Sequence, residues 1–124
     1  MLDFLAISLG AAAGANLRYW MSRSALRWVG PGFPYSTLSI NVLGSFVLGF
    51  FMMWTTERAM VDPRWRLLIA VGFCGGYTTF SSYAYETVAF FEQGQWTLMA
   101  ANFFANNLLA CLAVMAGMAL ARVL

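Results

Sequence analysis

The fold of this chain is decided by residues 72–83, which read GFCGGYTTFSSY. The stretch lies within an apolar run at about 67–91 that is long enough to cross a membrane. Adjacent glycines and threonines are unfavourable inside a helix, where each glycine costs about 1 kcal/mol relative to alanine. At membrane depth, irregular backbone persists only where it is buried in protein or lines a cavity. The stretch therefore predicts a transmembrane helix broken near Gly75 to Thr78, unless the glycines serve only to let two helices pack closely.

The composition is that of an integral membrane protein in a lipid bilayer. Of the 124 residues, 61% are hydrophobic and 10% are charged, whereas soluble domains carry roughly 25% charged residues. The chain has no histidine, which excludes histidine-based zinc or haem chemistry. A net charge of +2 is too small to indicate nucleic-acid binding. No nucleophile–base pair, phosphate loop or paired carboxylates are visible, so the sequence does not indicate an enzyme.

Hydropathy predicts an all-α membrane protein with four transmembrane helices in a single domain that covers residues 1–124. The expected spans lie at about 4–26, 38–54, 67–91 and 98–120, each near the roughly 17–25 apolar residues that a crossing needs. Tryptophans fall near the predicted ends, as in an interfacial aromatic belt. The pairs Gly10/Gly14 and Ser45/Gly49 predict faces on which helices approach closely.

Arginines are nearly balanced between the two ends of the predicted bundle. Four crossings would place both termini and the connection between the second and third spans on one side. The positive-inside rule then gives no firm orientation. Either the flanks are assigned poorly, or copies insert in both orientations and pair as an antiparallel two-fold dimer. One side would carry Arg58, Arg64, Arg66 and Arg122, and the other Arg23, Arg27 and, if it reaches the interface, Arg18.

Several uncharged side chains within the spans could contact an ion. Phe80 and Tyr83 lie about one turn apart. Because an aromatic ring has a positive edge, they could stabilise a partly dehydrated anion, or they could be an ordinary packing pair. Asn41 in the second span, and Asn102 with Asn106 on one face of the fourth, either hydrogen-bond between helices or line a pore.

Two charged residues near span ends leave several interpretations open. Arg18 could extend to the membrane interface or supply positive potential at a vestibule. Glu86 could pair with an arginine, face water or titrate.

Residues 72–83 resemble the GFCGGLTTFSTF signature of the Fluc (CrcB) fluoride channels. Supporting matches lie at residues 14–20 (GANLRYW), 34–38 (PYSTL) and 41–44 (NVLG), and Glu86 falls where the family carries a glutamate. The resemblance covers the whole chain. It implies a passive, fluoride-selective channel in the bacterial inner membrane that exports fluoride and gives fluoride resistance. It also implies a dual-topology, antiparallel homodimer with two fluoride pathways.

The resemblance implies which residues meet fluoride. Asn41 would contact the ion, and the ring edges of Phe80 and Tyr83 would line its path. Asn106 falls at a polar position of the fourth span. Apart from the resemblance, the hydroxyl of Thr79 is a further candidate donor to the ion.

The resemblance further implies a vestibule and a structural cation. Arg18 would lie near the vestibule. The backbone carbonyls of Gly75 and Thr78 from both copies would hold a sodium ion at the dimer centre. Such a cation would offset the cost of nearby anions.

Two positions depart from the family pattern. Tyr83 stands where the signature has phenylalanine, so a pathway lined only by ring edges is not expected at that point. Leu109 and Ala110 stand where the family has a Gly-Ser pair, so no pore serine is expected there.

Two other classes of function remain open at this stage. A proton-coupled exporter of cationic drugs needs a carboxylate near the membrane centre, whereas Asp3 and Glu86 lie near the ends of their spans. An assembly subunit without a transport role would show no distinguishing motif. For a channel, moving a small ion into a low-dielectric medium costs on the order of 20 kcal/mol in the Born limit, which replacement contacts must largely recover.

Overall fold

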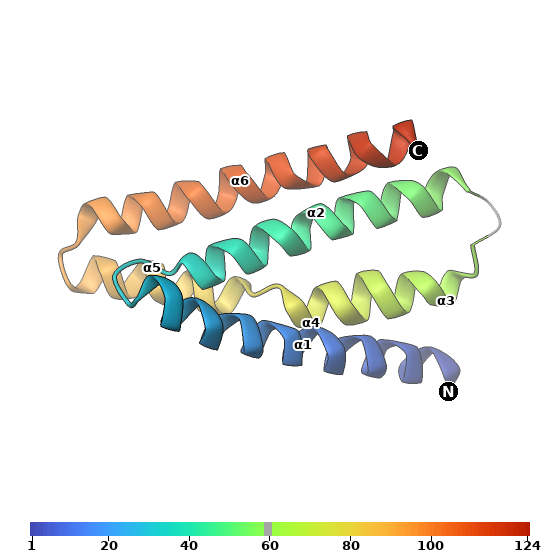
Figure 1. Ribbon diagram of the computed structural model, residues 1–124, viewed down its shortest axis with the longest axis horizontal. Helices are drawn as coiled ribbons and strands as arrows, with labels where there is room; N and C mark the ends of the chain where they lie inside the picture. Colours follow the sequence, from blue (N-terminus) through green and yellow to red (C-terminus); the bar gives the residue numbers. More distant parts are fainter. Residues whose placement is uncertain (59–60) are drawn as a thin grey trace.

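The computed structural model describes residues 1–58 and 61–124, which form four helical rods (Figure 1). Residues 30–34 connect the first rod to the second, and residues 93–95 connect the third to the fourth. All regular structure in these residues is helical, which confirms the all-α class. The third rod along the chain is a composite of shorter helices, whereas each of the others is a single helix. The helices are α1 (Leu2–Val29), α2 (Tyr35–Glu57), α3 (Pro63–Arg66), η1 (Leu67–Cys74), α4 (Gly75–Tyr77), α5 (Phe80–Glu92) and α6 (Trp96–Val123).

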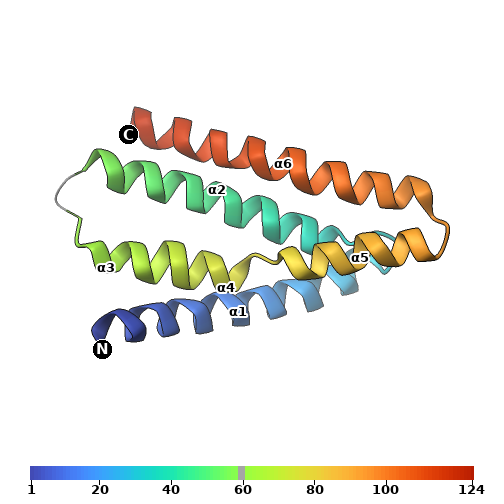
Figure 2. The same cartoon turned by 180° about the vertical axis from the view of Figure 1, so that it is seen from behind.

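The helices match a membrane protein in length and composition. Of those described, α2 and α6 are long and apolar enough to cross a membrane. Helix α1 has 28 residues, but Asp3, Asn16 and Arg18 lower its hydropathy, and the third rod is divided among short helices. Both termini lie at the same end of the bundle, as an even number of crossings requires (Figure 2). Four separate crossings stay a prediction.

The third rod begins with a capped turn and then widens. Pro63 starts α3, where its missing N–H group is not needed, and the Asp62 side chain caps the same turn. From Leu67 to Cys74 the chain forms a π-helix of 8 residues. This form is rare and is often found at functional sites. Nothing in the sequence predicted it.

Close packing holds α1 against the third rod. A Cβ atom added to Gly10 would overlap the carbonyl oxygen of Leu68, and one added to Gly14 would overlap that of Phe73. The two backbones therefore approach each other as closely as small residues allow. This confirms the packing face that the Gly10/Gly14 pair predicted.

The break in the third rod lies at two threonines and not at the glycines. The break was predicted near Gly75 to Thr78, and it lies at the far end of that stretch, because helix α4 continues through Gly75 and Gly76 to Tyr77. The extended residues are Thr78 (φ −74°, ψ 157°) and Thr79 (φ −146°, ψ 105°), a conformation that β-branched residues favour. At Gly76 an added Cβ would lie 2.6 Å from the carbonyl oxygen of Ala11. The alternative interpretation, glycine as a means of close packing, is therefore right for Gly76.

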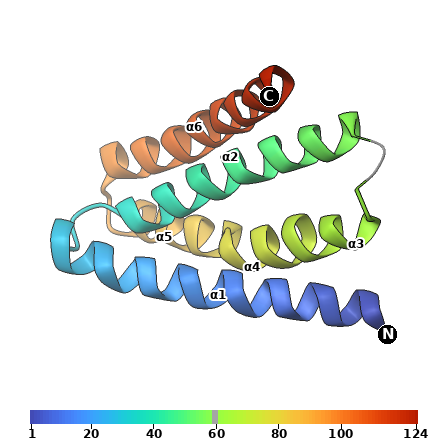
Figure 3. The same ribbon diagram turned by 45° about the vertical axis from the view of Figure 1, so that its right-hand side comes forward.

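Helix α6 packs mainly on α2 and lies on the far side of the bundle from α1 (Figure 3). A Cβ atom on Gly49 would overlap the backbone of Val114, and one on Gly117 would overlap the backbone of Phe46. The close approach predicted at Gly49 is therefore confirmed, with Gly117 as its unpredicted counterpart. The same helix α6 also contacts α5, which brings the second half of the third rod beside α2 and α6.

Candidate functional site

Asn41 on α2 satisfies the backbone that the break leaves exposed. Its Oδ1 atom accepts a hydrogen bond from the Thr79 N–H at 2.8 Å. Its Nδ2 atom donates to the Thr79 carbonyl oxygen at 3.1 Å. Extended backbone has no helical partners, and an unsatisfied polar group at membrane depth costs several kcal/mol. The carboxamide therefore replaces both hydrogen bonds that Thr79 would make inside a helix.

A row of carboxamides continues from Asn41 across the bundle. Asn41 Nδ2 also donates to Asn106 Oδ1 at 3.0 Å, and Asn106 Nδ2 donates to Asn102 Oδ1 at 2.9 Å. Asn102 Nδ2 in turn donates to the Thr87 hydroxyl at 3.0 Å. Asn102 is 0% exposed and Asn106 is 4% exposed. The Asn41–Asn106 and Asn102–Thr87 bonds join different helices, whereas the Asn106–Asn102 bond lies within α6. In the single chain the amide hydrogens are therefore engaged with one another, with backbone and with the Thr87 hydroxyl.

The break also frees two carbonyl oxygens from helical hydrogen bonds. The usual donor to Gly75 O is the Thr79 N–H, which instead donates to the α2 carboxamide. The usual donor to Thr78 O is the Ser82 N–H, which instead caps α5 by donating to the Thr79 hydroxyl at 3.2 Å. Arg18 Nη1 lies 3.5 Å from Thr78 O. The site therefore combines freed carbonyls with a nearby guanidinium.

The described residues contain no group of three His, Cys, Asp or Glu side chains placed to hold a metal ion. A cation at the break would thus depend on backbone oxygen. Gly75 leaves room for this, because a Cβ added there would meet nothing within 4 Å. Carbonyl oxygens are suitable ligands for a hard monovalent cation. The residues expected to hold sodium therefore fit that role chemically.

The aromatic pair beyond the break divides into one outward ring and one buried ring. The Phe80 and Tyr83 centroids are 5.4 Å apart and the rings meet edge-on at 68°. Phe80 is 76% exposed, whereas Tyr83 is 7% exposed. The Tyr83 hydroxyl accepts a hydrogen bond from Asn107 Nδ2 at 2.8 Å. The sequence analysis assigned no role to Asn107. The signal that could have identified it is that the hydroxyl of a buried tyrosine needs a hydrogen-bond partner.

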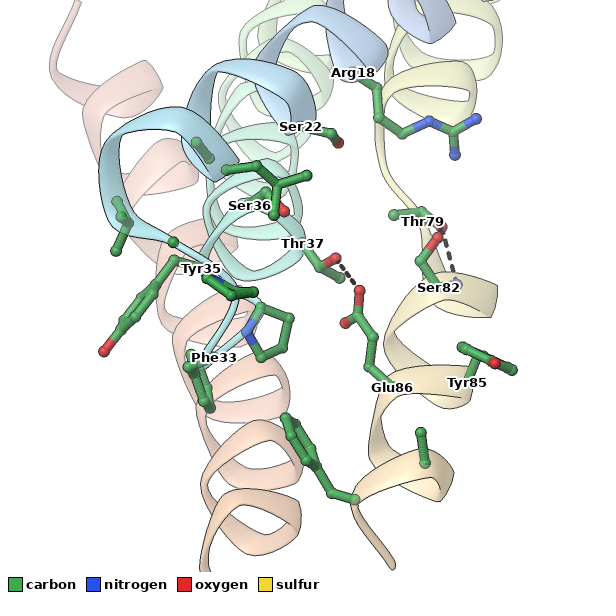
Figure 4. A pocket seen from close by; sticks show the side chains of 18 of the residues that line it. Arg18, Ser22, Phe33, Tyr35, Ser36, Thr37, Thr79, Ser82, Tyr85 and Glu86 are labelled. Atoms are coloured by element: carbon green, nitrogen blue, oxygen red, sulfur yellow. Dashed lines mark hydrogen bonds between the residues drawn. The ribbon is translucent and has the colours of Figure 1, made fainter. Parts of the chain in front are cut away.

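A cavity of about 560 Å³ leads from the α1–α2 connection toward the break. Its wall includes Arg18 from α1, Thr37 from α2, Thr79 from the break and Ser82 from the first turn of α5 (Figure 4). Hydroxyl groups on this wall could hydrogen-bond an ion that has lost part of its water. Arg18, the residue predicted for a vestibule, lies where the cavity reaches the break.

Glu86 and Thr37 face each other across the same cavity (Figure 4). The Thr37 hydroxyl donates to Glu86 Oε1 at 2.6 Å. The second carboxylate oxygen, Oε2, is buried and has no hydrogen-bond partner within the described residues. Of the interpretations left open for Glu86, pairing with arginine is not what the structure shows. Thr37 was not among the predicted site residues, because nothing in the sequence links it to a carboxylate 49 positions away.

Comparison with known proteins gives one consistent family. A family model described as "CrcB-like protein, Camphor Resistance (CrcB)" matches residues 5–118. A protein of Koribacter versatilis is 56% identical over 120 residues, which cover 97% of this chain and 95% of the relative. A protein of a Sulfurihydrogenibium species is 44% identical over 124 residues and covers 100% of both chains. Both relatives are named "Fluoride-specific ion channel FluC".

Proposed function

This chain belongs to the CrcB family, and on that premise we propose that it is a passive, fluoride-selective ion channel and not an enzyme. The family match carries the proposal. The extended backbone at Thr78–Thr79, beside a hydroxyl-lined cavity, supports it physically. Export of fluoride through the bacterial inner membrane would protect the cytoplasm. The alternative of a proton-coupled drug exporter has no support in these findings.

Fluoride would enter through the cavity and lose its water stepwise. The cost of full dehydration, on the order of 20 kcal/mol, requires polar contacts all along the path. Hydroxyls near the break, such as those of Thr79 and Ser82, would make the first replacements. Arg18 would raise the local anion concentration by its positive potential.

Beyond the cavity, Asn41 and Asn106 would supply amide donors by exchanging partners. Each amide hydrogen now bonds a neutral oxygen. An arriving anion would replace that oxygen as acceptor, so the number of hydrogen bonds is kept while the new bond gains charge assistance. The released oxygens recover their bonds when the ion leaves. This exchange would let the ion bind without being trapped, which conduction requires.

The outward position of Phe80 favours assembly with a second copy. In the single chain the Phe80 residue is 76% exposed. Its ring edge can line a narrow ion path only if another surface covers the ring. The nearby Ser81 and Asn107 are polar and also exposed, which is unfavourable against lipid. The balanced arginines agree with insertion in both orientations. A dual-topology, antiparallel homodimer with two fluoride pathways accounts for these features together.

Sodium would bind at the centre of such a dimer, on the Gly75 and Thr78 carbonyl oxygens of both copies. The ion would supply positive charge that lowers the cost of nearby anions. The chain's contribution is to keep these carbonyls out of helical hydrogen bonds, since Asn41 and the Thr79 hydroxyl take the N–H groups that would otherwise bond them. The Arg18 guanidinium, whose Nη1 donates to Thr78 O at 3.5 Å, would have to give up that contact to the ion.

Ion efflux from liposomes tests the function. Purified protein is reconstituted into vesicles loaded with potassium fluoride or potassium chloride, and efflux is followed with ion-selective electrodes after addition of valinomycin. We expect rapid fluoride efflux and chloride efflux no faster than from protein-free vesicles. Phe80→Ile keeps an apolar side chain but removes the ring edge, and should slow fluoride. Equal rates for the two halides, or no fluoride efflux, would refute the proposal.

Antiparallel assembly has its own test. A tag at the C-terminus should be labelled from both sides of the membrane in cells, and chemical crosslinking should give dimers. A tag found on one side only would contradict dual topology without affecting the conduction result.

A further inference from the structure

A tyrosine hydroxyl inside the bundle leads to a further inference, which rests on the proposed fluoride conduction. Tyr83 is 7% exposed and its ring meets Phe80 edge-on, with centroids 5.4 Å apart. Its hydroxyl reaches α6, where its partner is Asn107 at 2.8 Å. A hydroxyl group thus lies beside the two rings expected to face the ion.

The orientation of the Asn107 carboxamide is set by a second contact. Its Nδ2 atom also donates to the Phe103 carbonyl oxygen at 2.7 Å. If the amide were reversed, Oδ1 would face that carbonyl, and two acceptors would meet without a proton between them. The amide nitrogen therefore faces Tyr83, and both of its hydrogens are used.

The proton of the Tyr83 hydroxyl must then point away from Asn107. A tyrosine hydroxyl carries one donor proton as well as acceptor lone pairs, and here a lone pair receives the Asn107 hydrogen. Within the described residues this is the one hydrogen bond that the Tyr83 hydroxyl makes. A buried donor without an acceptor is costly at membrane depth. The arrangement leaves one donor available to a group from outside the chain.

We propose that Tyr83 donates this hydrogen bond to the conducted anion, and that Asn107 is the positioning residue that turns the hydroxyl toward it. An O–H group bonded to an ion makes a short, strong hydrogen bond. Fluoride is smaller than chloride and concentrates the same charge, so it gains more from that bond. Tyr83 thereby determines specificity at a point where a phenyl ring could offer only its weakly positive edge.

A double-mutant cycle on the liposome assay separates this role from a structural one. The variants are Tyr83→Phe, Asn107→Leu and the double variant, and the readout is the ratio of fluoride to chloride efflux. Tyr83→Phe should lower the ratio about tenfold, which corresponds to about 1.4 kcal/mol. Asn107→Leu should lower it in the Tyr83 background and change nothing further in the Tyr83→Phe background.

Asn16→Leu is the matched control. Asn16 is an exposed carboxamide on α1 that donates to the carbonyl oxygen of Ala12 at 2.7 Å, the same one-turn contact that Asn107 makes with Phe103. Its substitution removes a comparable polar group far from Tyr83 in the chain and should leave the halide ratio unchanged.

Failure of the inference is distinguishable from failure of the proposed function. If the unmodified protein conducts no fluoride, the proposed function fails. If it conducts fluoride selectively but Tyr83→Phe keeps the same ratio, only the hydroxyl role is overturned. An Asn107→Leu effect of equal size in both backgrounds would overturn the positioning role. Should Tyr83→Phe not elute as a folded species, the ratio of Asn107→Leu decides, and an unchanged value overturns the inference.

Discussion

Replacement of Asn41 by leucine should destabilise the protein more than any exposed substitution. The Asn41 side chain makes three hydrogen bonds, to the N–H and the carbonyl of Thr79 and to Asn106. Leucine has a similar size and makes none of them. Thr79 is 6% exposed, so water cannot readily replace the lost partners.

The expected magnitude follows from two estimates. Leaving a buried donor or acceptor unsatisfied costs about 1–3 kcal/mol, and Asn41→Leu leaves two such backbone groups on Thr79. Interhelical hydrogen bonds measured in membranes average about 0.6 kcal/mol each, which gives about 2 kcal/mol for three. We therefore expect a loss of about 2–5 kcal/mol in the free energy of unfolding.

Unfolding by increasing mole fractions of dodecyl sulfate in mixed micelles, followed by circular dichroism, measures this change. Asn16→Leu serves as the control, since its single exposed contact should contribute less than about 0.5 kcal/mol. Fluoride efflux should also fall in Asn41→Leu. The idea that Asn41 holds the break open would be refuted if the free energy of unfolding of Asn41→Leu lay within about 0.5 kcal/mol of that of the control, the size of a typical surface substitution. Such a result would mean that the backbone of Thr79 had found helical hydrogen-bond partners instead.

Three further outcomes are expected. Gly76→Ala should prevent α1 from packing on α4, because the added Cβ would lie 2.6 Å from the carbonyl oxygen of Ala11. The control is Gly32→Ala, whose added Cβ would meet no atom within 4 Å, and it should unfold like the parent protein in the dodecyl sulfate titration. Thr37→Val should slow fluoride efflux and lower stability by about 1 kcal/mol by removing the donor to Glu86; unaltered efflux would exclude this pair from the pathway. Reconstitution with N-methylglucamine in place of all sodium should weaken dimers seen by crosslinking, and sodium-independent crosslinking would argue against the central cation.

The sequence located the interruption of the third rod to within a few residues but misjudged its cause. Glycine and threonine both disfavour helix, and propensity alone cannot say which residue the fold will extend. The contacts decide: Gly76 is required for the approach of α1, while Asn41 compensates the extended Thr79. These contacts come from α1 and α2, so the sequence of the third rod alone could not show which residues stay helical and which are extended.

Candidate residues could be singled out from the sequence, but the contacts between them could not. Carboxamides in apolar helices are rare enough to stand out, so Asn41 and Asn106 were chosen as candidates, and the structure brings these two side chains into contact. Their order in one hydrogen-bonded row depends on helix rotation, which periodicity gives only roughly. Asn107 and Thr37 were missed because each acts through a partner distant in sequence. The π-helix at Leu67–Cys74 was not predicted from the sequence.

The pairing of helices bears on how the chain is made. Helix α1 packs mainly on η1 and α4, and α2 mainly on α6, so the most extensive contacts join rods that are not consecutive. During synthesis each of the first two rods must therefore wait in lipid for a partner that has not yet left the ribosome. A chain interrupted before Trp96 would leave the close-packing surface around Gly49 without its counterpart. We expect such fragments to be degraded, so that only chains that include α6 complete their assembly.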